Sequence, residues 1–203
     1  MPETSISLLN RLQRSDAPEN WDRLVGLYGP LLNIWLRKYG VQDSDTDDLI
    51  QDVMLAVSSN LRSFDHNGRP GAFRAWLRSI LVNRLRNFWR ARDRRPQVQG
   101  DSDIDRQLME LQDPASSMSQ LWNRQHDQHV LRKLLELTKP QFAPETWLVF
   151  NRVAMKGERA DIVAAEMGIS INAVFIAKSR VLSSLRREAA GLIESSQDFS
   201  KES

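Results

Sequence analysis

Two adjacent segments between residues 43 and 95 constrain the fold most, because both have helical spacing of apolar residues but they carry opposite charge. The first segment carries no base before Arg62 and holds the aspartates Asp43, Asp45, Asp47, Asp48 and Asp52. The second has a single acid, Asp93, among the arginines Arg69, Arg74, Arg78, Arg84, Arg86, Arg90, Arg92, Arg94 and Arg95. An acidic helix followed by a basic, aromatic one predicts two interaction faces, one for a protein and one for a polyanion.

Apolar residues recur at helical spacing along most of the chain, and no β-type alternation of convincing length is present. The pattern therefore predicts an all-α fold. Pro30 falls within a predicted helix at 21–39 and is expected to kink or divide it. Asp45 or Thr46 is expected to cap the next helix.

A polar, acidic stretch at 97–119 separates two helical parts and predicts a linker, with a short helix at 104–111. We therefore expect two small helical domains joined by this linker, the first at 1–96 and the second at 120–193. The polar residues 194–203 predict a disordered tail.

Composition excludes several classes of protein. The chain has 203 residues, a formal net charge of only +2 and no cysteine. The absence of cysteine excludes a disulfide framework and a thiolate metal site. The first residues lack the apolar core of a signal peptide, and no run approaches the roughly 18 apolar residues of a membrane span. These features predict a cytoplasmic protein that does not associate with membranes.

The acidic helix is expected to bury one stripe of residues, formed by Leu49, Ile50, Val53, Met54, Val57 and Leu61. The opposite face then carries Asp48, Gln51, Asp52 and Leu55. Such a face is either an ordinary solvated surface or a docking surface for a protein. Leu55 favours docking, because an apolar residue surrounded by acids is typical of an interaction patch.

The basic helix is expected to bury Phe73, Leu77, Ile80, Leu81 and Phe88. Another side of this helix gathers Trp76, Ser79, Asn83, Arg86 and Arg90. Arginine contacts phosphates, tryptophan stacks on bases and asparagine contacts base edges, so this side predicts a nucleic-acid surface. The alternative is an arginine-rich surface that serves solubility, with Trp76 partly buried.

The segment RADIVAAEMGISINAVFIAKSRVLSSLRR predicts a helix-turn-helix. Its first helix ends at Met167, Gly168 provides the left-handed turn, Ile169 fills the corner and Ser170 caps the second helix. The second helix is expected to face inward through Val174, Ala177, Val181 and Leu185, and outward through Asn172, Ile176, Ser179, Arg180, Ser183 and Arg187.

The order of these features resembles the extracytoplasmic-function (ECF) class of bacterial sigma factors, over nearly the whole chain. DDLIQDVMLAV resembles the family's polymerase-binding helix, and FRAWLRSILVNRLRNFWRARDRR resembles the helix that opens and holds the promoter's minus-ten element. MGISINAVFIAKSRVLSSLRR resembles the helix that contacts the minus-thirty-five element. The resemblance implies a factor that binds core RNA polymerase and directs promoter recognition, strand opening and transcription initiation.

The resemblance also implies partners and site residues. The clamp of the polymerase largest subunit would be contacted by Asp48, Gln51, Asp52 and Leu55. The flap of the polymerase is a further implied partner. An anti-sigma factor is another candidate partner. Minus-ten DNA would be contacted by Asn67, Arg74, Trp76, Ser79, Asn83, Arg86 and Arg90. Minus-thirty-five DNA would be contacted by Ser170, Asn172, Ala173, Ile176, Ser179, Arg180 and Arg187.

The chain departs from the family pattern in the second helix of the helix-turn-helix. The family usually has Thr, then Lys, Ser and Arg, where this chain has Ala173, Phe175, Ile176 and Ala177. Apolar residues can contact thymine methyl groups, so phosphate contacts would fall to Lys178, Arg180, Arg186 and Arg187.

Other functions compete with this one. His126 and His129 lie three residues apart on a predicted helix, as metal ligands can, but neither Cys nor a suitably spaced Glu completes a ligand set. No phosphate-binding glycine loop and no nucleophile–base pair is recognisable. We therefore expect no enzyme activity, metal or cofactor. A helix-turn-helix regulator that acts without polymerase would leave the acidic face and the side of the basic helix with Trp76 and Arg90 without a role. An RNA-binding adaptor would share the basic helix but would need no promoter DNA.

Overall fold

The computed structural model describes residues 7–14, 17–65, 71–93 and 101–193. These residues form helices and no β-strand, apart from an isolated bridge between Ala190 and Ile193. The predicted all-α fold is thereby confirmed. The α-helices are α1 (Leu8–Arg14), α2 (Pro18–Lys38), α3 (Asp43–Leu61), α4 (Ala72–Asp93), α5 (Asp101–Gln112), α6 (Ser117–Thr138), α7 (Pro144–Phe150), α8 (Ala160–Met167) and α9 (Ile171–Ala189). A 3-10 turn (Lys139–Gln141) follows α6, and a π-helical turn (Asn151–Met155) follows α7.

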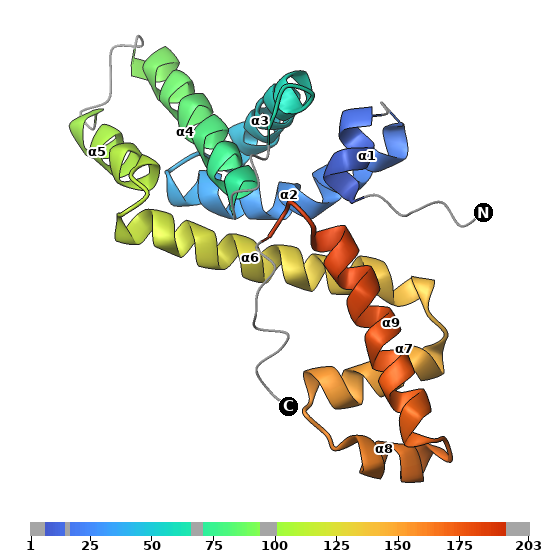
Figure 1. Cartoon of the computed structure of the whole chain (residues 1–203). Helices are drawn as coiled ribbons and strands as arrows, with labels where there is room; N and C mark the ends of the chain where they lie inside the picture. Colours follow the sequence, from blue (N-terminus) through green and yellow to red (C-terminus); the bar gives the residue numbers. More distant parts are fainter. Residues whose placement is uncertain (1–6, 15–16, 66–70, 94–100, 194–203) are drawn as a thin grey trace.

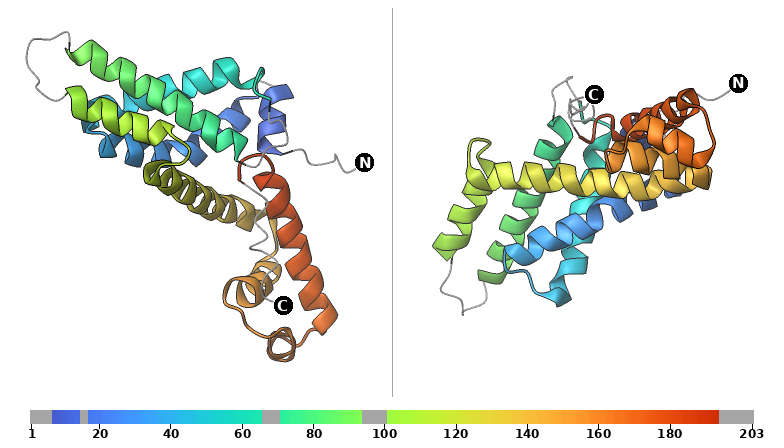
Figure 2. Two further views of the ribbon diagram at one scale, coloured as in Figure 1. Left: turned by 60° about the vertical axis from the view of Figure 1, so that its left-hand side comes forward. Right: turned by 90° about the horizontal axis from the view of Figure 1, so that it is seen from below.

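The helices form one layered body with an extension at one end (Figure 1). Within the body, α3 packs on α2 and α4, and α5 packs on α4 and α6. The long helix α6 crosses α2, and its C-terminal part leads to α7 and α9 (Figures 1 and 2). The helix α8 and the N-terminal half of α9 project away from the body, so the helix-turn-helix stands at the end of the extension (Figures 1 and 2).

Pro30 does not divide α2, which runs unbroken from Pro18 to Lys38. Of the two expected effects, division of the helix is therefore wrong, and a kink at Pro30 stays a prediction. Pro30 and Gly26 are both exposed. Because proline has no N–H, the carbonyl of Gly26 loses its helical partner, but solvent is available to that carbonyl.

The predicted cap of α3 was also wrong. The helix begins at Asp43, and Gln42 occupies the cap position without a side-chain cap hydrogen bond. The Thr46 hydroxyl donates to the Gln42 carbonyl at 2.8 Å. Asp45 lies 2.5 Å from Arg92 and thereby ties the start of α3 to the end of α4.

One hydrophobic core extends over both predicted domains, from Leu8 in α1 to Ile193 after α9. The largest fully buried side chains are Trp35, Trp122, Tyr28, Phe73 and Phe150, which come from α2, α4, α6 and α7. A second, small core of Val149, Val163, Ala164 and Val174 holds the helix-turn-helix together. The division at residues 96 and 120 stays a prediction, and the predicted tail at 194–203 lies outside the described residues.

Aromatic side chains form the contact between α2 and α6. The rings of Trp35 and Trp122 meet edge to face, with centroids 5.1 Å apart. The Trp122 indole N–H donates to the Arg74 carbonyl at 3.2 Å, so α4 is held at the same place. Aromatic side chains of this size bury about 150–250 Å² each, which makes this contact a major part of the core.

Two buried histidines of α6 complete the contact with α2. His126 Nδ1 lies 2.8 Å from an Asp127 oxygen and Nε2 lies 3.2 Å from the Tyr28 hydroxyl. Because a carboxylate only accepts, Nδ1 carries the proton and Nε2 accepts from Tyr28. His129 Nε2 donates to the Leu27 carbonyl at 2.7 Å, and Nδ1 accepts from Arg132 at 3.2 Å. Both imidazoles are therefore neutral in this arrangement.

A buried carboxylate ties the end of α9 to the N-terminal helices. The Glu188 side chain is only 6% exposed and lies 2.9 Å from Arg11 of α1 and 3.7 Å from Arg23 of α2. Residues that are far apart in the sequence thus share one buried charge cluster.

Among the described residues, no single helix is long and apolar enough to cross a membrane. Only α8 and α9 taken together, which meet at 109°, satisfy the length and composition criteria.

We expect the free energy of unfolding to fall as the pH drops from about 7 to about 5. Burial lowers the pKa of His126 and of His129 below the value of 6.5. At pH values between the folded and the unfolded pKa, the unfolded chain binds more protons than the folded chain. The contribution of the two histidines to stability is therefore complete above about pH 6.5 and is lost below it. Denaturant unfolding at a series of pH values measures this effect.

The matched variants are His126→Gln with His129→Gln, and Gln128→Ala on the exposed side of the same helix. The double variant should show a flatter pH dependence, whereas Gln128→Ala should keep that of the parent chain. If the free energy of unfolding falls equally steeply as the pH drops in the parent chain and in the double variant, the two histidines do not cause the pH dependence.

Candidate functional site

The structure gathers the predicted docking residues on one exposed face of α3. Asp48, Gln51, Asp52 and Leu55 are all exposed, and Leu55 is 64% exposed. The opposite stripe of α3 is buried against α2 and α4, except that Ile50 is half-buried. The face therefore results from the helical period, which turns the acidic residues away from the core.

Only part of the acidic segment is free to bind a partner. Asp43 lies 3.0 Å from Arg37, and Asp45 is paired with Arg92. Within the part of the chain that the structure describes, Asp48 and Asp52 have no ion-pair partner. The available negative charge is therefore concentrated around the exposed Leu55.

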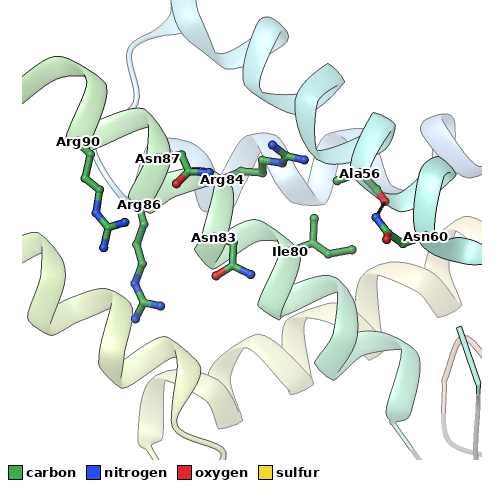
Figure 3. Close-up of a pocket in the computed structure, with 8 residues that line it drawn as sticks. All are labelled: Ala56, Asn60, Ile80, Asn83, Arg84, Arg86, Asn87 and Arg90. Carbon is green, nitrogen blue, oxygen red and sulfur yellow. Dashed lines mark hydrogen bonds between the residues drawn. The ribbon is translucent and has the colours of Figure 1, made fainter. Parts of the chain in front are cut away.

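A groove of about 490 Å³ runs between α3 and α4 (Figure 3). Two residues from α3 and six from α4 line it: Ala56, Asn60, Ile80, Asn83, Arg84, Arg86, Asn87 and Arg90. The Asn60 amide donates to the Ala56 carbonyl at 2.8 Å, as the dashed line in Figure 3 marks. The lining combines guanidinium groups with amides, which suits phosphates together with base edges.

The groove carries uncompensated positive charge. Its arginines are Arg84, Arg86 and Arg90, and none of them has an ion-pair partner among the described residues. Each guanidinium thus keeps its donors available for a polyanion.

Some of the predicted minus-ten residues line the groove, whereas others make contacts within the fold. Asn83, Arg86 and Arg90 line the groove together, as expected. Ser79 is half-buried, and its hydroxyl donates to the Ala75 carbonyl of its own helix at 3.0 Å.

Trp76 and Arg74 belong to packing contacts instead. Trp76 is half-buried against Phe64 and Phe73, with ring centroids at 4.7 and 5.5 Å. The Arg74 side chain is 12% exposed and lies 2.5 Å from Asp127 of α6. Asn67 lies outside the described residues.

Five groove residues were not predicted as site residues: Ala56, Asn60, Ile80, Arg84 and Asn87. Ile80, Arg84 and Asn87 recur at helical spacing, which is a detectable pattern. It was overlooked because Ile80 was assigned to the core, whereas Ile80 is half-buried and borders the groove. Asn60 belongs to another helix, and only the packing of α3 on α4 brings it to this place.

The helix-turn-helix has the predicted local geometry. α8 and α9 meet at 109°, and Gly168 between them adopts a left-handed conformation with φ +64°. The Ser170 hydroxyl accepts the N–H of Ala173 at 3.1 Å and so caps α9. Ile169, which was expected to fill the corner, is 37% exposed, so that expectation was wrong. Val163, Ala164 and Val174 fill the corner instead.

The predicted minus-thirty-five residues mostly lie on the outward face of α9. The capping Ser170 is exposed, and so are five residues of the helix itself: Asn172, Ile176, Ser179, Arg180 and Arg187. Ala173 is half-buried. Arg187 also donates to the Ser184 hydroxyl at 3.3 Å.

His126 and His129 serve the packing of α6 on α2 through the hydrogen bonds described above. In the part of the chain that the structure describes, no group of three or more His, Asp or Glu residues has a geometry that could hold a metal ion.

The family model of sigma-70 region 2 matches residues 24–95, a range that contains both the acidic face and the groove. These residues therefore belong to the sigma-70 region 2 family. The resemblance to bacterial sigma factors is confirmed for this part of the chain.

The matching relatives are RNA polymerase sigma factors. The chain is 34% identical to CnrH of Cupriavidus metallidurans over 91 residues, which are 45% of this chain and 46% of the relative. It is 33% identical to NccH of Alcaligenes xylosoxydans xylosoxydans over 104 residues, 51% of this chain and 54% of the relative. The chain thus spans about half the length of the curated relatives it matches. The structure also aligns with a chain from the solved structure of CnrH in complex with the cytosolic domain of CnrY. The alignment covers 88% of the present chain and 92% of the chain in that complex, with 23% sequence identity and a TM-score of 0.36.

Replacing Arg84 and Arg86 by Ala should weaken the binding of a single-stranded oligonucleotide by the full chain. Each phosphate contact that is lost should lower the slope of log K against log salt by about 0.7. Fluorescence anisotropy over a salt series measures both quantities. Arg124→Ala, at an exposed position of α6 outside the groove, is the control and should change neither. An unchanged slope in the double variant would remove the groove from nucleic-acid binding.

Proposed function

We propose that the chain is an ECF-type sigma factor, which binds core RNA polymerase and directs promoter recognition, strand opening and transcription initiation. The observation that carries the proposal is the pairing of two surfaces within one region 2 domain. The acidic face of α3 carries Asp48, Asp52 and Leu55, and the groove beside it is lined by unpaired arginines and by amides. A factor that brings polymerase to promoter DNA needs both a protein-docking face and a nucleic-acid surface.

The proposed partner of the acidic face is the clamp of the polymerase largest subunit. Asp48 and Asp52 would supply charge, Gln51 would supply hydrogen bonds, and Leu55 would supply the apolar contact at the centre. An exposed apolar side chain surrounded by polar ones is typical of a docking site. The flap of the polymerase is the proposed partner of the second domain, and an anti-sigma factor stays a predicted partner.

The proposed role of the groove is to hold unpaired minus-ten DNA. Arg84, Arg86 and Arg90 would contact phosphates, and Asn83 would contact a base edge. The half-burial of Trp76 leaves part of its ring for stacking, as a platform supported by Phe64 and Phe73. A DNA contact by Arg74 would require the release of its pair with Asp127.

The proposed domain organisation follows from these roles. Residues 1–96 would act as the region 2-like domain and residues 120–193 as the region 4-like domain that contacts the minus-thirty-five element through α9. The segment 97–119, which includes α5, would connect them. Such a factor acts in the cytoplasm as a regulator of transcription rather than as an enzyme.

A helix-turn-helix regulator that acts without polymerase is less favoured. It would use α8 and α9 alone, whereas the region 2 match covers residues 24–95, outside that motif. An RNA-binding adaptor would use the groove, but it would need neither the acidic face of α3 nor a duplex-binding motif.

Charge reversal on α3 tests polymerase binding. The Asp48→Lys, Asp52→Lys chain should no longer co-purify with core polymerase, because both residues lie at the centre of the proposed docking face. Its stability should change by no more than about 0.5 kcal/mol, as is usual for exposed positions without partners. A pull-down with core polymerase and thermal melting measure the two effects.

The control reverses the same charge elsewhere, with Asp22→Lys and Asp105→Lys at exposed positions of α2 and α5. This chain should bind core normally. Undiminished core binding by the α3 variant would remove the docking assignment.

Strand opening tests the groove within the holoenzyme. The Asn83→Ala, Arg86→Ala variant should bind core and the closed promoter but form few permanganate-reactive open complexes. A template that is already melted at the minus-ten element should restore part of the activity, because the variant then avoids the opening step. Trp76→Ala is a poorer probe, since removal of a half-buried aromatic side chain also destabilises the fold. Normal opening by the folded double variant would contradict the role of the groove.

A further inference from the structure

The first turns of α9 expose apolar side chains that the core does not use. Ile171, Phe175 and Ile176 are 46%, 53% and 44% exposed. The inward stripe of the helix is already complete, because Val174 and Val181 are fully buried. The exposed side chains therefore contribute little to the stability of the fold, which suggests that they serve binding.

These residues occupy the part of a helix-turn-helix that enters the DNA major groove. Ser170 caps α9, so Ile171 is the first residue of the recognition helix. The N-terminal residues of such a helix contact base edges. Ile171 and Phe175 lie four residues apart, as do Asn172 and Ile176, so two adjacent rows face outward together.

The charges around this surface fit DNA. Between Ile171 and Arg187, α9 carries Lys178, Arg180, Arg186 and Arg187 and no acid. Its next acid, Glu188, is buried against Arg11.

The acids of the neighbouring segment are held in ion pairs rather than left free beside α9. Arg152 binds both Glu158 and Glu166, and Arg159 pairs with Asp161 at 2.7 Å. The outward surface of the helix-turn-helix is therefore apolar at its tip and basic along α9, which suits a groove with phosphates on both sides.

Base chemistry then selects the target. In the major groove, every base pair presents hydrogen-bond donors or acceptors, but only thymine adds an apolar group, its 5-methyl. Isoleucine and phenylalanine cannot hydrogen-bond with their side chains, so their favourable contacts are with these methyl groups. Asn172 is the one side chain among the outward residues 171–176 that can hydrogen-bond a base edge.

We propose that Ile171, Phe175 and Ile176 contact thymine methyl groups and set a preference for a thymine-containing upstream promoter element. The inference rests on the proposed function for the second domain and adds to it the base that is recognised. These three side chains become specificity-determining residues, and Arg180 and Arg187 hold the flanking phosphates.

The test removes only the methyl groups. Duplex fragments with a randomised upstream element are selected with the full chain bound to core polymerase, and in parallel with the full chain alone. The enriched element is then made again with single thymines replaced by uracil. Each replacement at a contacted position should weaken binding roughly fourfold, the effect expected for one buried group of methyl size.

Variants assign the effect to the side chains. Phe175→Ala and Ile176→Ala chains should bind the thymine and uracil forms of the element with more nearly equal affinity. Ile34→Ala, at an exposed apolar position of α2, should keep the full difference. Circular dichroism checks that each variant retains its helices.

Equal binding of the thymine and uracil fragments, or an enriched element without thymine, would overturn the inference. The inference would also be overturned if neither the chain bound to core polymerase nor the chain alone selects any duplex. That result would indicate that the apolar surface binds a protein. Co-purification with core polymerase is measured separately, so failure of the thymine contacts is distinguishable from failure of the proposed function.

Discussion

The contact between α2 and α6 supports the rest of the structure. Trp35 packs edge to face on Trp122, and Tyr28 donates to the buried His126. This contact fixes α2, on which α3 packs, and α6, from which the helix-turn-helix extends. Because the polar atoms of both histidines are paired in the neutral form, the contact combines apolar burial with a defined hydrogen-bond pattern.

The proposed binding surfaces are the faces that this packing leaves free. α3 and α4 turn their apolar stripes toward the core, so Asp48 and Asp52 of α3 and the groove arginines of α4 remain accessible, whereas Arg78 of α4 is buried. Packing also uses some charges that looked available. Asp45 joins Arg92, and Arg74 joins Asp127, so fewer charges remain available for partners.

The shared core has a consequence for the proposed function. α9 carries the proposed duplex-binding face at its N-terminal end, whereas at its other end Glu188 is buried against Arg11 and Arg23. The helix-turn-helix is thus held by its base to α1 and α2, while its outward face stays exposed. Relative movement of the two parts would have to break this charge cluster and the contact between α2 and α6.

Local patterns were sufficient for much of the fold. The helical period identified the buried stripe of α3 and the exposed positions of Asp48, Asp52 and Leu55, since both follow from a repeat within one helix. Gly168 and Ser170 identified the turn and the cap, because their conformations and hydrogen bonds involve only near neighbours in the sequence. The sequence features in residues 24–95 were also sufficient to indicate a sigma factor, which the family match confirms for that segment.

Contacts between distant residues were decided only by the tertiary structure. Arg74 and Trp76 have the chemistry of DNA-binding residues, but Asp127 pairs with the first, and Phe64 and Phe73 half-bury the second. Asn60 lines the same groove as Arg84 because α3 packs on α4. The sequence alone determined which residues could bind, through periodicity and side-chain chemistry. The tertiary structure determined which of them remain free, because burial and ion pairing depend on neighbours that no local pattern specifies.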